Sequence, residues 1–265
     1  MPGALAWREI REKRNDLSDY VIHFTSPISN PTILAEGVLR QILRDKHIMP
    51  SFSPMSNRHS KGIKHNTVKG PDPVVCFTEM PLWAVIQTRK VFPGTMGFGI
   101  AYHKRCLYEA GGRPVIYGDQ SLVGTEIKPG EPGYIPNRVI YAGGVLPPSH
   151  QYLWAMFDPH DPGSRMPNVD FTWEREWRIK VRKPGLPVIL FEDKARIPRG
   201  MILVETDFHR GRFIEELDEL DRQDQNVYDW AKWIRVVSLE LAEHQIKAGN
   251  VAYARLETWP EKRTQ

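Results

Sequence analysis

The segment Phe171–Arg182 (FTWEREWRIKVR) constrains the fold more than any other part of the 265-residue chain. Apolar and charged residues alternate along it, a pattern that is typical of a half-buried β-strand. The apolar parity holds Phe171, Trp173, Trp177, Ile179 and Val181, with Arg175 as its exception, and the other parity holds Glu174, Glu176, Arg178, Lys180 and Arg182. We therefore expect one long strand that places Glu174, Glu176 and Arg178 on one face, about 7 Å apart.

Shorter apolar runs predict further strands at 20–25, 73–79, 97–102, 114–117, 186–191 and 201–206. Helical spacing of apolar residues or helix-start signals predict helices at 5–17, 30–44, 80–90, 150–157 and 212–224. The 22 prolines and 20 glycines favour short strands and many turns over a helical bundle. We expect a single α+β domain over 1–265 with a mixed, mostly antiparallel sheet and peripheral helices. Its core would span about 18–206, and 207–265 would form a C-terminal helical extension.

The composition, with 41% hydrophobic and 26% charged residues, is ordinary for a globular protein and excludes disordered, collagenous and coiled-coil classes. Cys76 and Cys106 are too few for a disulfide framework or a zinc site, so we expect a cytoplasmic protein. No apolar run is long enough to span a membrane, and the first fourteen residues are too charged for a secretory signal. The histidines are scattered, and phosphate-loop, nucleophile-elbow and zinc-helix motifs are missing. We expect no metal and no membrane partner.

The excess of positive charge is local. The net charge is +4, and the segment 50–71 contains no acidic residue but four cations, Arg58, Lys61, Lys64 and Lys69. A loop of this length is usually functional or disordered. It is either a solvated loop or a surface that contacts a phosphate-rich acceptor such as nucleic acid. The acidic helix expected at 212–224 has the same two interpretations, a solvated face or a surface for a protein partner.

Three polar features lie on predicted strands and suggest chemistry. His23 and Thr25 point the same way from the strand at 20–25, Thr78 lies near the end of 73–79, and Glu174 and Glu176 alternate with tryptophans. Desolvation raises the pKa of paired carboxylates, and Arg178 would partly offset that effect. A held glutamate that faces a histidine and a hydroxyl suits a ribosyl centre with an oxocarbenium-like transition state. The alternative is a solvated strand face and a hydrogen-bonded core histidine.

Several segments together resemble a known family. They are the His-Phe-Thr strand, AEGVLRQILRDKHIMPS, VCFTEMPL, GFGIAYHK, RPVIYG and WEREWRIK, which cover about residues 20 to 182. They resemble the AbiGi-like abortive-infection proteins and, more distantly, ADP-ribosyltransferases of the DarT and diphtheria-toxin-like kind. One departure is Lys46, which stands where relatives often carry a glycine after the first helix.

The transferase resemblance implies an ADP-ribosyltransferase-like fold with NAD as substrate. It implies that Glu176 is the catalytic glutamate and that Glu174 helps to position or activate the acceptor. The residues implied to bind NAD are His23 and Thr25 at a ribose, Thr78 beside the nicotinamide pocket, Tyr102 as an aromatic for stacking, and Arg178. The basic segment 50–71 could then contact the NAD pyrophosphate or the acceptor.

Three functions remain open from the sequence. The first is an NAD-dependent ADP-ribosyltransferase-like effector in bacterial anti-phage or toxin–antitoxin defence. The second is a non-catalytic antitoxin or regulatory binding protein on the same fold, as the abortive-infection resemblance also implies. The third is a metal-dependent nuclease, because WEREWRIK places Lys180 near paired acids.

Overall fold

The computed structural model describes the following residues: 16–25, 34–52, 54–56, 64–66, 68–91, 96–157, 172–181, 185–187, 200–223, 231 and 234–259. The chain divides into two compact units. Unit 1 comprises the residues up to Lys46, 79–107 and 187 onward, and unit 2 comprises 47–78 and 108–186. Outside the described residues lie positions 5–15 of the helix predicted at 5–17, the residues Arg58 and Lys61, and the strand residues 188–191. Asp16 and Leu17, the last two residues of that predicted helix, are described and are not helical.

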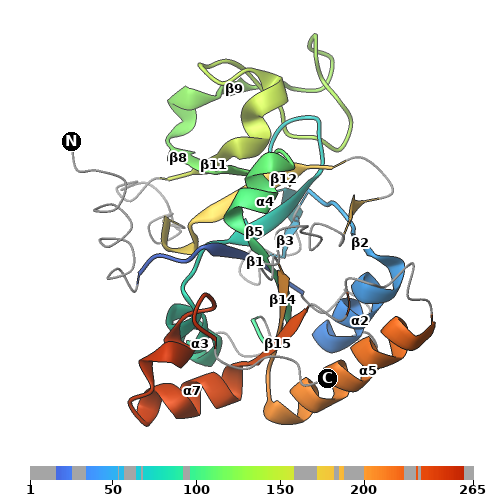
Figure 1. The fold of residues 1–265 in the computed structure, drawn as a ribbon. Coiled ribbons are helices and arrows are strands. Elements are labelled where there is room, and N and C mark those ends of the chain that lie inside the picture. The colour runs from blue at the N-terminus through green and yellow to red at the C-terminus, as the bar shows by residue number, and fades with distance from the viewer. Residues whose placement is uncertain are drawn as a thin grey trace. The chain divides into compact units, whose positions relative to one another are not determined.

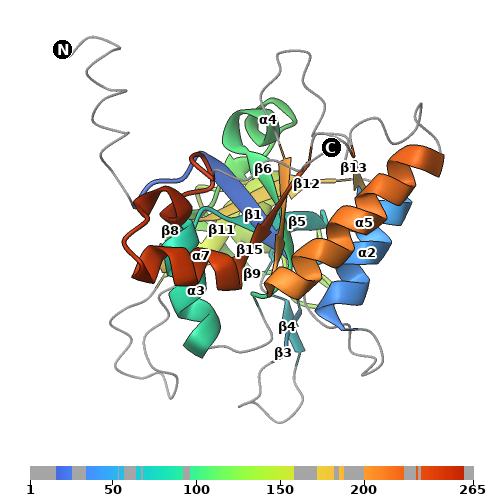
Figure 2. The same ribbon diagram turned by 60° about the horizontal axis from the view of Figure 1, so that its bottom comes forward.

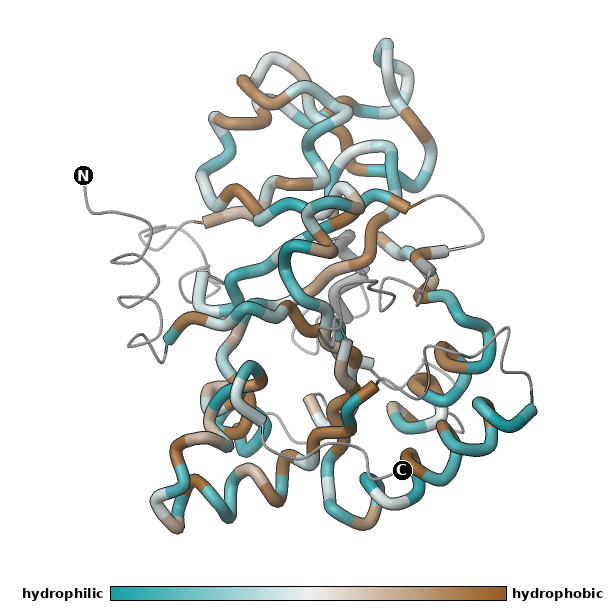
Figure 3. Tube along the Cα trace, viewed as in Figure 1, coloured by the Kyte–Doolittle hydropathy of each residue, from teal (hydrophilic) through white to brown (hydrophobic). Residues whose placement is uncertain are grey.

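Unit 1 is built on strands in the order β15 (Arg235–Ser238), β14 (Gly200–Val204), β6 (Gly99–His103) and β1 (Tyr20–Phe24). β6 pairs antiparallel with β1 and with β14, and β14 pairs parallel with β15. These pairs confirm the strands predicted at 20–25, 97–102 and 201–206. The tube in Figure 3 shows apolar residues gathered on β14 and β15, which is expected of strands that build a core.

Two helix pairs cover the strands of unit 1. α3 (Leu82–Val91) packs against α7 (Leu239–Lys247), and α2 (Ala35–Asp45) is joined by ion pairs to α5 (Asp207–Gln223). The two pairs lie on opposite sides of these strands (Figures 1 and 2). The helices predicted at 30–44, 80–90 and 212–224 are confirmed with shifted ends. None of the helices in the described part of the chain combines the length and apolarity that a membrane crossing requires.

The C-terminal residues contribute directly to the core of unit 1. One buried cluster combines side chains from β1, α3, β6, β14, β15 and α7 with Trp259, which follows η6. Its members include Tyr20, Ile22, Leu82, Ile86, Ala101, Met201, Leu203, Val237, Leu239 and Trp259. Trp259 is only 2% exposed and packs edge-on against Tyr253 of the 3-10 turn η6 (Val251–Ala254). Residues 207–259, which the sequence suggested as an extension of the core, therefore supply a strand and buried side chains to it.

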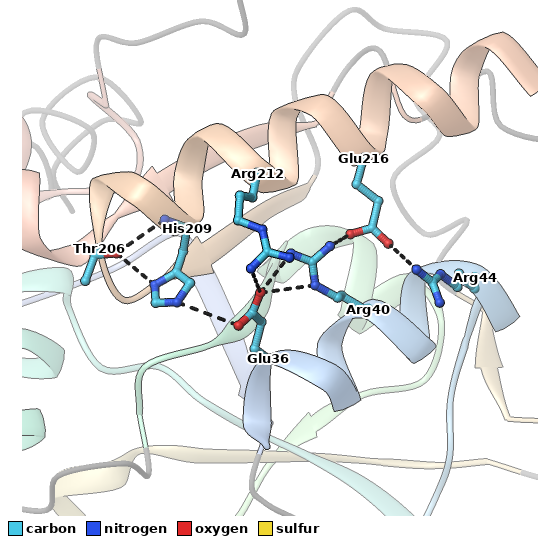
Figure 4. A network of polar contacts seen from close by, with 7 residues as sticks. All are labelled: Glu36, Arg40, Arg44, Thr206, His209, Arg212 and Glu216. Carbon is cyan, nitrogen blue, oxygen red and sulfur yellow. Dashed lines mark hydrogen bonds and ion pairs between the residues drawn. The ribbon is translucent and has the colours of Figure 1, made fainter. Parts of the chain in front are cut away.

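An ion-pair network joins α2 to α5 (Figure 4). Glu216 pairs with Arg40 and with Arg44, the latter at 3.2 Å. Glu36 pairs with Arg40 at 2.8 Å and lies 3.7 Å from both His209 Nε2 and an Arg212 nitrogen. The Arg40 guanidinium also lies over the ring of Phe213, 4.5 Å from its centroid. At least one acidic side chain of the predicted 212–224 helix is therefore used inside unit 1.

α2 ends in a left-handed residue. Lys46 has φ 59° and ψ 21°, the conformation that glycine adopts most easily at a helix C-terminus. A lysine there costs roughly 1 kcal/mol more than glycine, because its Cβ crowds the backbone. Lys46 therefore ends α2 in the left-handed conformation without a glycine.

Unit 2 contains the antiparallel strands β5 (Val74–Thr78), β12 (Glu176–Lys180) and β7 (Arg113–Pro114), with β12 between the other two. Its other pairs are β8 (Ile116–Gly118) with β11 (Trp154–Met156), β9 (Gly124–Glu126) with β10 (Tyr141–Gly143), and β3 (Pro54–Ser56) with β4 (Lys64–Asn66). The shorter elements of the chain are β2 (His47–Ile48), β13 (Leu186–Pro187), α4 (Lys104–Glu109), and the 3-10 turns η1 (Gln120–Leu122), η2 (Pro148–Leu153) and η3 (Thr172–Glu174). Helices and mostly antiparallel pairs among the described strands confirm the α+β class.

Two sequence predictions in unit 2 are wrong in part. The helix predicted at 150–157 is the 3-10 turn η2 followed by β11. The strand predicted over Phe171–Arg182 has only five residues, Glu176–Lys180, because Arg175 adopts φ 47° and breaks the extended backbone. Glu174 is consequently in η3 and not on the strand face that it was predicted to share with Glu176 and Arg178.

Candidate functional site

The pairing of β5 with β12 assembles a polar cluster in unit 2. Thr78 lies opposite Glu176, and Cys76 lies opposite Arg178. Residues two apart on a strand share a face, so these four side chains point to the same side of the strand pair. With Glu174 and Tyr117, which interact with Glu176 as described below, they form what we call the carboxylate site.

Arg178 is the buried anchor of this site. Its side chain is 3% exposed, and its Nε and Nη2 each donate to one oxygen of Glu176 at 2.8 Å. Nη1 donates to the carbonyls of Tyr152 and Trp154 at 2.8 and 3.0 Å. Burial alone would lower the pKa of Arg178, but the charge and hydrogen bonds of Glu176 raise it above its ordinary value. This bidentate pair fixes the Glu176 carboxylate in one orientation.

A strained turn places Glu174. Arg175, with φ 47°, is a non-glycine residue in the left-handed region, which costs on the order of 1–3 kcal/mol and is characteristic of functional sites. The Arg175 N–H donates to the carbonyl of Thr172 at 3.1 Å. The Thr78 hydroxyl donates to the carbonyl of Glu174 and so ties the turn to β5. The turn takes Glu174 out of the strand alternation but keeps it electrostatically coupled to Glu176.

The ionisable groups of the carboxylate site are strongly perturbed. Burial, followed by the charge of Glu176, raises the pKa of Glu174 to about 7, against the opposing effect of Arg178. Burial raises the pKa of Tyr117 to about 12, and its hydroxyl accepts a hydrogen bond from the Glu176 N–H at 2.8 Å. Burial and then Glu176 raise the pKa of the Cys76 thiol well above its usual range. Near neutral pH, Glu174 can therefore both accept and release a proton.

The raised pKa of Glu174 predicts a pH-dependent stability. The folded chain holds a proton on Glu174 up to about pH 7, whereas the ordinary pKa of a glutamate, which applies in the unfolded chain, is 4.5. Between these two pH values the folded state therefore binds more protons than the unfolded state. The free energy of unfolding should therefore fall as the pH rises from about 4.5 to 7. In Glu174→Gln this decline should be weaker. Denaturant titrations across this range compare wild type with Glu174→Gln and with Glu131→Gln, an exposed control. Parallel curves for wild type and Glu174→Gln would contradict the assignment.

The other predicted site residues belong to unit 1. The Thr25 hydroxyl is 2% exposed and bonds to the carbonyls of Ala35 and Phe98 at 2.8 and 3.2 Å. Tyr102 is 0% exposed, and burial raises its pKa further above the ordinary value. His23 on β1 lies opposite Ile100 on β6, and its side chain is partly exposed. Thr25 and Tyr102 thus have structural positions in unit 1, and His23 retains surface for a ligand.

Thr78, Glu174, Glu176 and Arg178 are the predicted residues that unit 2 brings together. Sequence reasoning did not include Cys76 or Tyr117 among the site residues. The signal for Cys76 was its spacing of two from Thr78 in VVCFT, which puts both on one strand face. Among the described residues, no group of three or more histidine, cysteine or acidic side chains is placed to hold a metal ion.

Comparisons with protein-family models, with curated proteins and with solved structures give no match to this chain.

Proposed function

We propose that this protein is an NAD-dependent ADP-ribosyltransferase-like effector, with Glu176 as the catalytic carboxylate. The observation that carries the proposal is the pair of unlike carboxylates in one site. Glu176 is locked to a buried arginine, and Glu174 has its pKa raised to about 7. Two carboxyl groups whose environments differ in this way are suited to divide the roles of charge stabilisation and proton transfer.

The proposed reaction breaks the bond between the nicotinamide nitrogen and C1′ of its ribose. Nicotinamide leaves with the bonding electron pair, and positive charge develops on the ribose. The Glu176 carboxylate, 14% exposed and held by Arg178, would stabilise that charge. A nucleophile of the acceptor then bonds to C1′, and deprotonated Glu174 takes the proton that the nucleophile loses.

The setting that we propose is bacterial anti-phage or toxin–antitoxin defence in the cytoplasm, on an ADP-ribosyltransferase-like fold. This rests on the sequence resemblance and on the presence of only two cysteines, too few for a disulfide framework, which suits a reducing compartment. The acceptor would be a nucleic acid or a protein, reached through the basic segment 50–71.

Binding of NAD tests the proposal directly. A ligand that binds only the folded state at a hundredfold excess over its dissociation constant raises the free energy of unfolding by about 2.7 kcal/mol. We expect NAD to produce such a shift in thermal unfolding, and we expect the protein to release nicotinamide from NAD on incubation. Nicotinamide alone at equal concentration should not produce the shift. Purified protein that is neither stabilised by NAD nor releases nicotinamide from it would refute the proposal.

One observation favours a second function, a non-catalytic antitoxin or regulatory binding protein. Both oxygens of Glu176 are already bound to Arg178, an arrangement that also serves as a purely structural ion pair. This function predicts no NAD binding and no effect on growth when the protein is expressed alone. Growth arrest on expression that is lost in Glu176→Ala would decide for the transferase.

A further inference from the structure

Unit 2 contains a pocket that the carboxylate site does not use. Its volume is about 530 Å³, within the range of small-molecule sites. Apolar side chains such as Pro50 and Pro73 form part of its wall, and Phe52, Asp72, Arg138 and Lys180 supply an aromatic ring and three charges. Among the described lining residues, two cations against one carboxylate give a net positive charge.

The aromatic ring in the pocket wall, Phe52, is stacked against the guanidinium of Arg138. The Arg138 guanidinium carbon lies 3.4 Å from the centroid of the Phe52 ring. Arg138 follows Asn137, which has φ 62°, and its Nη1 donates to the Asn137 carbonyl at 3.0 Å. A guanidinium plane stacked on an aromatic ring is a surface on which nucleobases stack in single-stranded recognition.

The second cation is held in place by three groups. Lys180 Nζ donates to the Ser149 carbonyl at 2.7 Å, lies 3.2 Å from Asp72 Oδ2, and lies 4.7 Å from the centroid of the Tyr152 ring. The Lys180 and Asp72 side chains are 36% and 45% exposed. The Lys180 ammonium is therefore held in one orientation but stays accessible to solvent. An anion could bind to it beside the Asp72 carboxylate.

We propose that this pocket binds a nucleotide, either free or as one link of a single-stranded nucleic acid, with the base against Arg138 and Phe52 and the phosphate at Lys180. A flat stacking surface beside a fixed ammonium matches a base and its phosphate, whereas an acidic peptide would need no stacking surface. Pro50 and Phe52 also begin the segment 50–71, which has no acidic residue and, besides the half-buried Lys69, three further cations that would attract a polyphosphate chain. This binding does not depend on ADP-ribosyl transfer.

Fluorescence anisotropy without NAD tests the proposal on the full chain. The probes are short labelled single-stranded DNA and RNA, with adenosine monophosphate and inorganic phosphate as competitors. Phe52→Ala should weaken binding about 5- to 150-fold, the usual effect of losing one stacked base contact. Lys180→Gln should lower the slope of log affinity against log salt by about 0.7, one phosphate contact on a single strand. Lys128→Gln is the matched control, because Lys128 is 61% exposed in unit 2 and pairs with Glu126 outside the pocket.

Asp72→Asn separates binding from folding, since it removes the Asp72 carboxylate that competes for Lys180. It should tighten binding, a gain that a misfolded variant would not give. Competition by adenosine monophosphate supports a free nucleotide, and binding of oligonucleotides alone supports a chain link. The proposal is overturned if no probe binds at millimolar concentration, if inorganic phosphate competes as well as the nucleotide, or if Lys128→Gln weakens binding as much as Lys180→Gln.

Discussion

Replacing Arg178 with methionine is expected to lower the free energy of unfolding by about 3–5 kcal/mol, the usual cost of breaking a buried ion pair from one side. The substitution leaves the Glu176 carboxylate without the guanidinium that binds both of its oxygens. It also removes the donor that serves the carbonyls of Tyr152 and Trp154. Methionine has a similar length and apolar stem, so the loss reports on the polar contacts more than on a cavity.

Urea denaturation monitored by tryptophan fluorescence measures this effect. Lys180→Met on the same strand is the control and should cost no more than about 1 kcal/mol, because the Lys180–Asp72 pair is exposed. The double variant Arg178→Met with Glu176→Leu should be more stable than Arg178→Met alone, since it leaves no buried charge unpaired. A loss in Arg178→Met no larger than in Lys180→Met would show that Arg178 does not anchor the site.

If the proposed transferase function is correct, Glu176→Gln will lower NAD turnover by about 100- to 1000-fold. The amide keeps the shape of the side chain but removes the charge that would stabilise a developing cation, and losing one such electrostatic contact typically has this effect. The loss should fall on kcat more than on KM, because the charge acts on the transition state and not on bound NAD. Nicotinamide release at saturating NAD measures it.

The effect of Glu176→Gln on stability has to be separated from its effect on the rate of the reaction. Glu176→Gln weakens the hold on Arg178, so the folded fraction is measured in the same buffer and turnover is expressed per folded molecule. Glu174→Gln is the matched variant, since Glu174 is coupled to Arg178 by charge but accepts neither of the two hydrogen bonds that Arg178 donates to Glu176. It should lower transfer to an acceptor more than it lowers nicotinamide release. Full turnover by Glu176→Gln would rule out the assigned role.

Much of the strand pattern was readable from local sequence, and the site was readable only in part. Apolar runs located β1, β5, β6 and β14, because each is a short segment with mostly buried side chains. The alternation in FTWEREWRIKVR predicted a longer strand than the five residues observed. Arg175, the exception in the apolar parity, is the residue that takes φ 47°, but a polar residue at one position does not by itself reveal a backbone torsion.

The residues of the carboxylate site were predicted better than their roles. The sequence placed Arg178 on a polar strand face, yet it is buried at 2% exposure. Its burial follows from the register that sets it opposite Cys76 and from the carbonyls of η2 and β11. These contacts join segments 24 or more residues apart. No periodicity within one segment encodes such pairings, which explains why Cys76 was missed.

The division of the chain into units has a consequence for the order of folding during synthesis. Unit 2 is formed from residues 47–78 and 108–186, so all of it has been translated before β14 begins at Gly200. β1 and α2 are made first, but the strand β15, the helix α5 that pairs with Arg40, and buried Trp259 come from the last quarter of the chain. Domains generally fold as units as they emerge from the ribosome. Unit 2 can thus be fully translated while unit 1, which also includes 79–107 between the two pieces of unit 2, still lacks its C-terminal strands and helices.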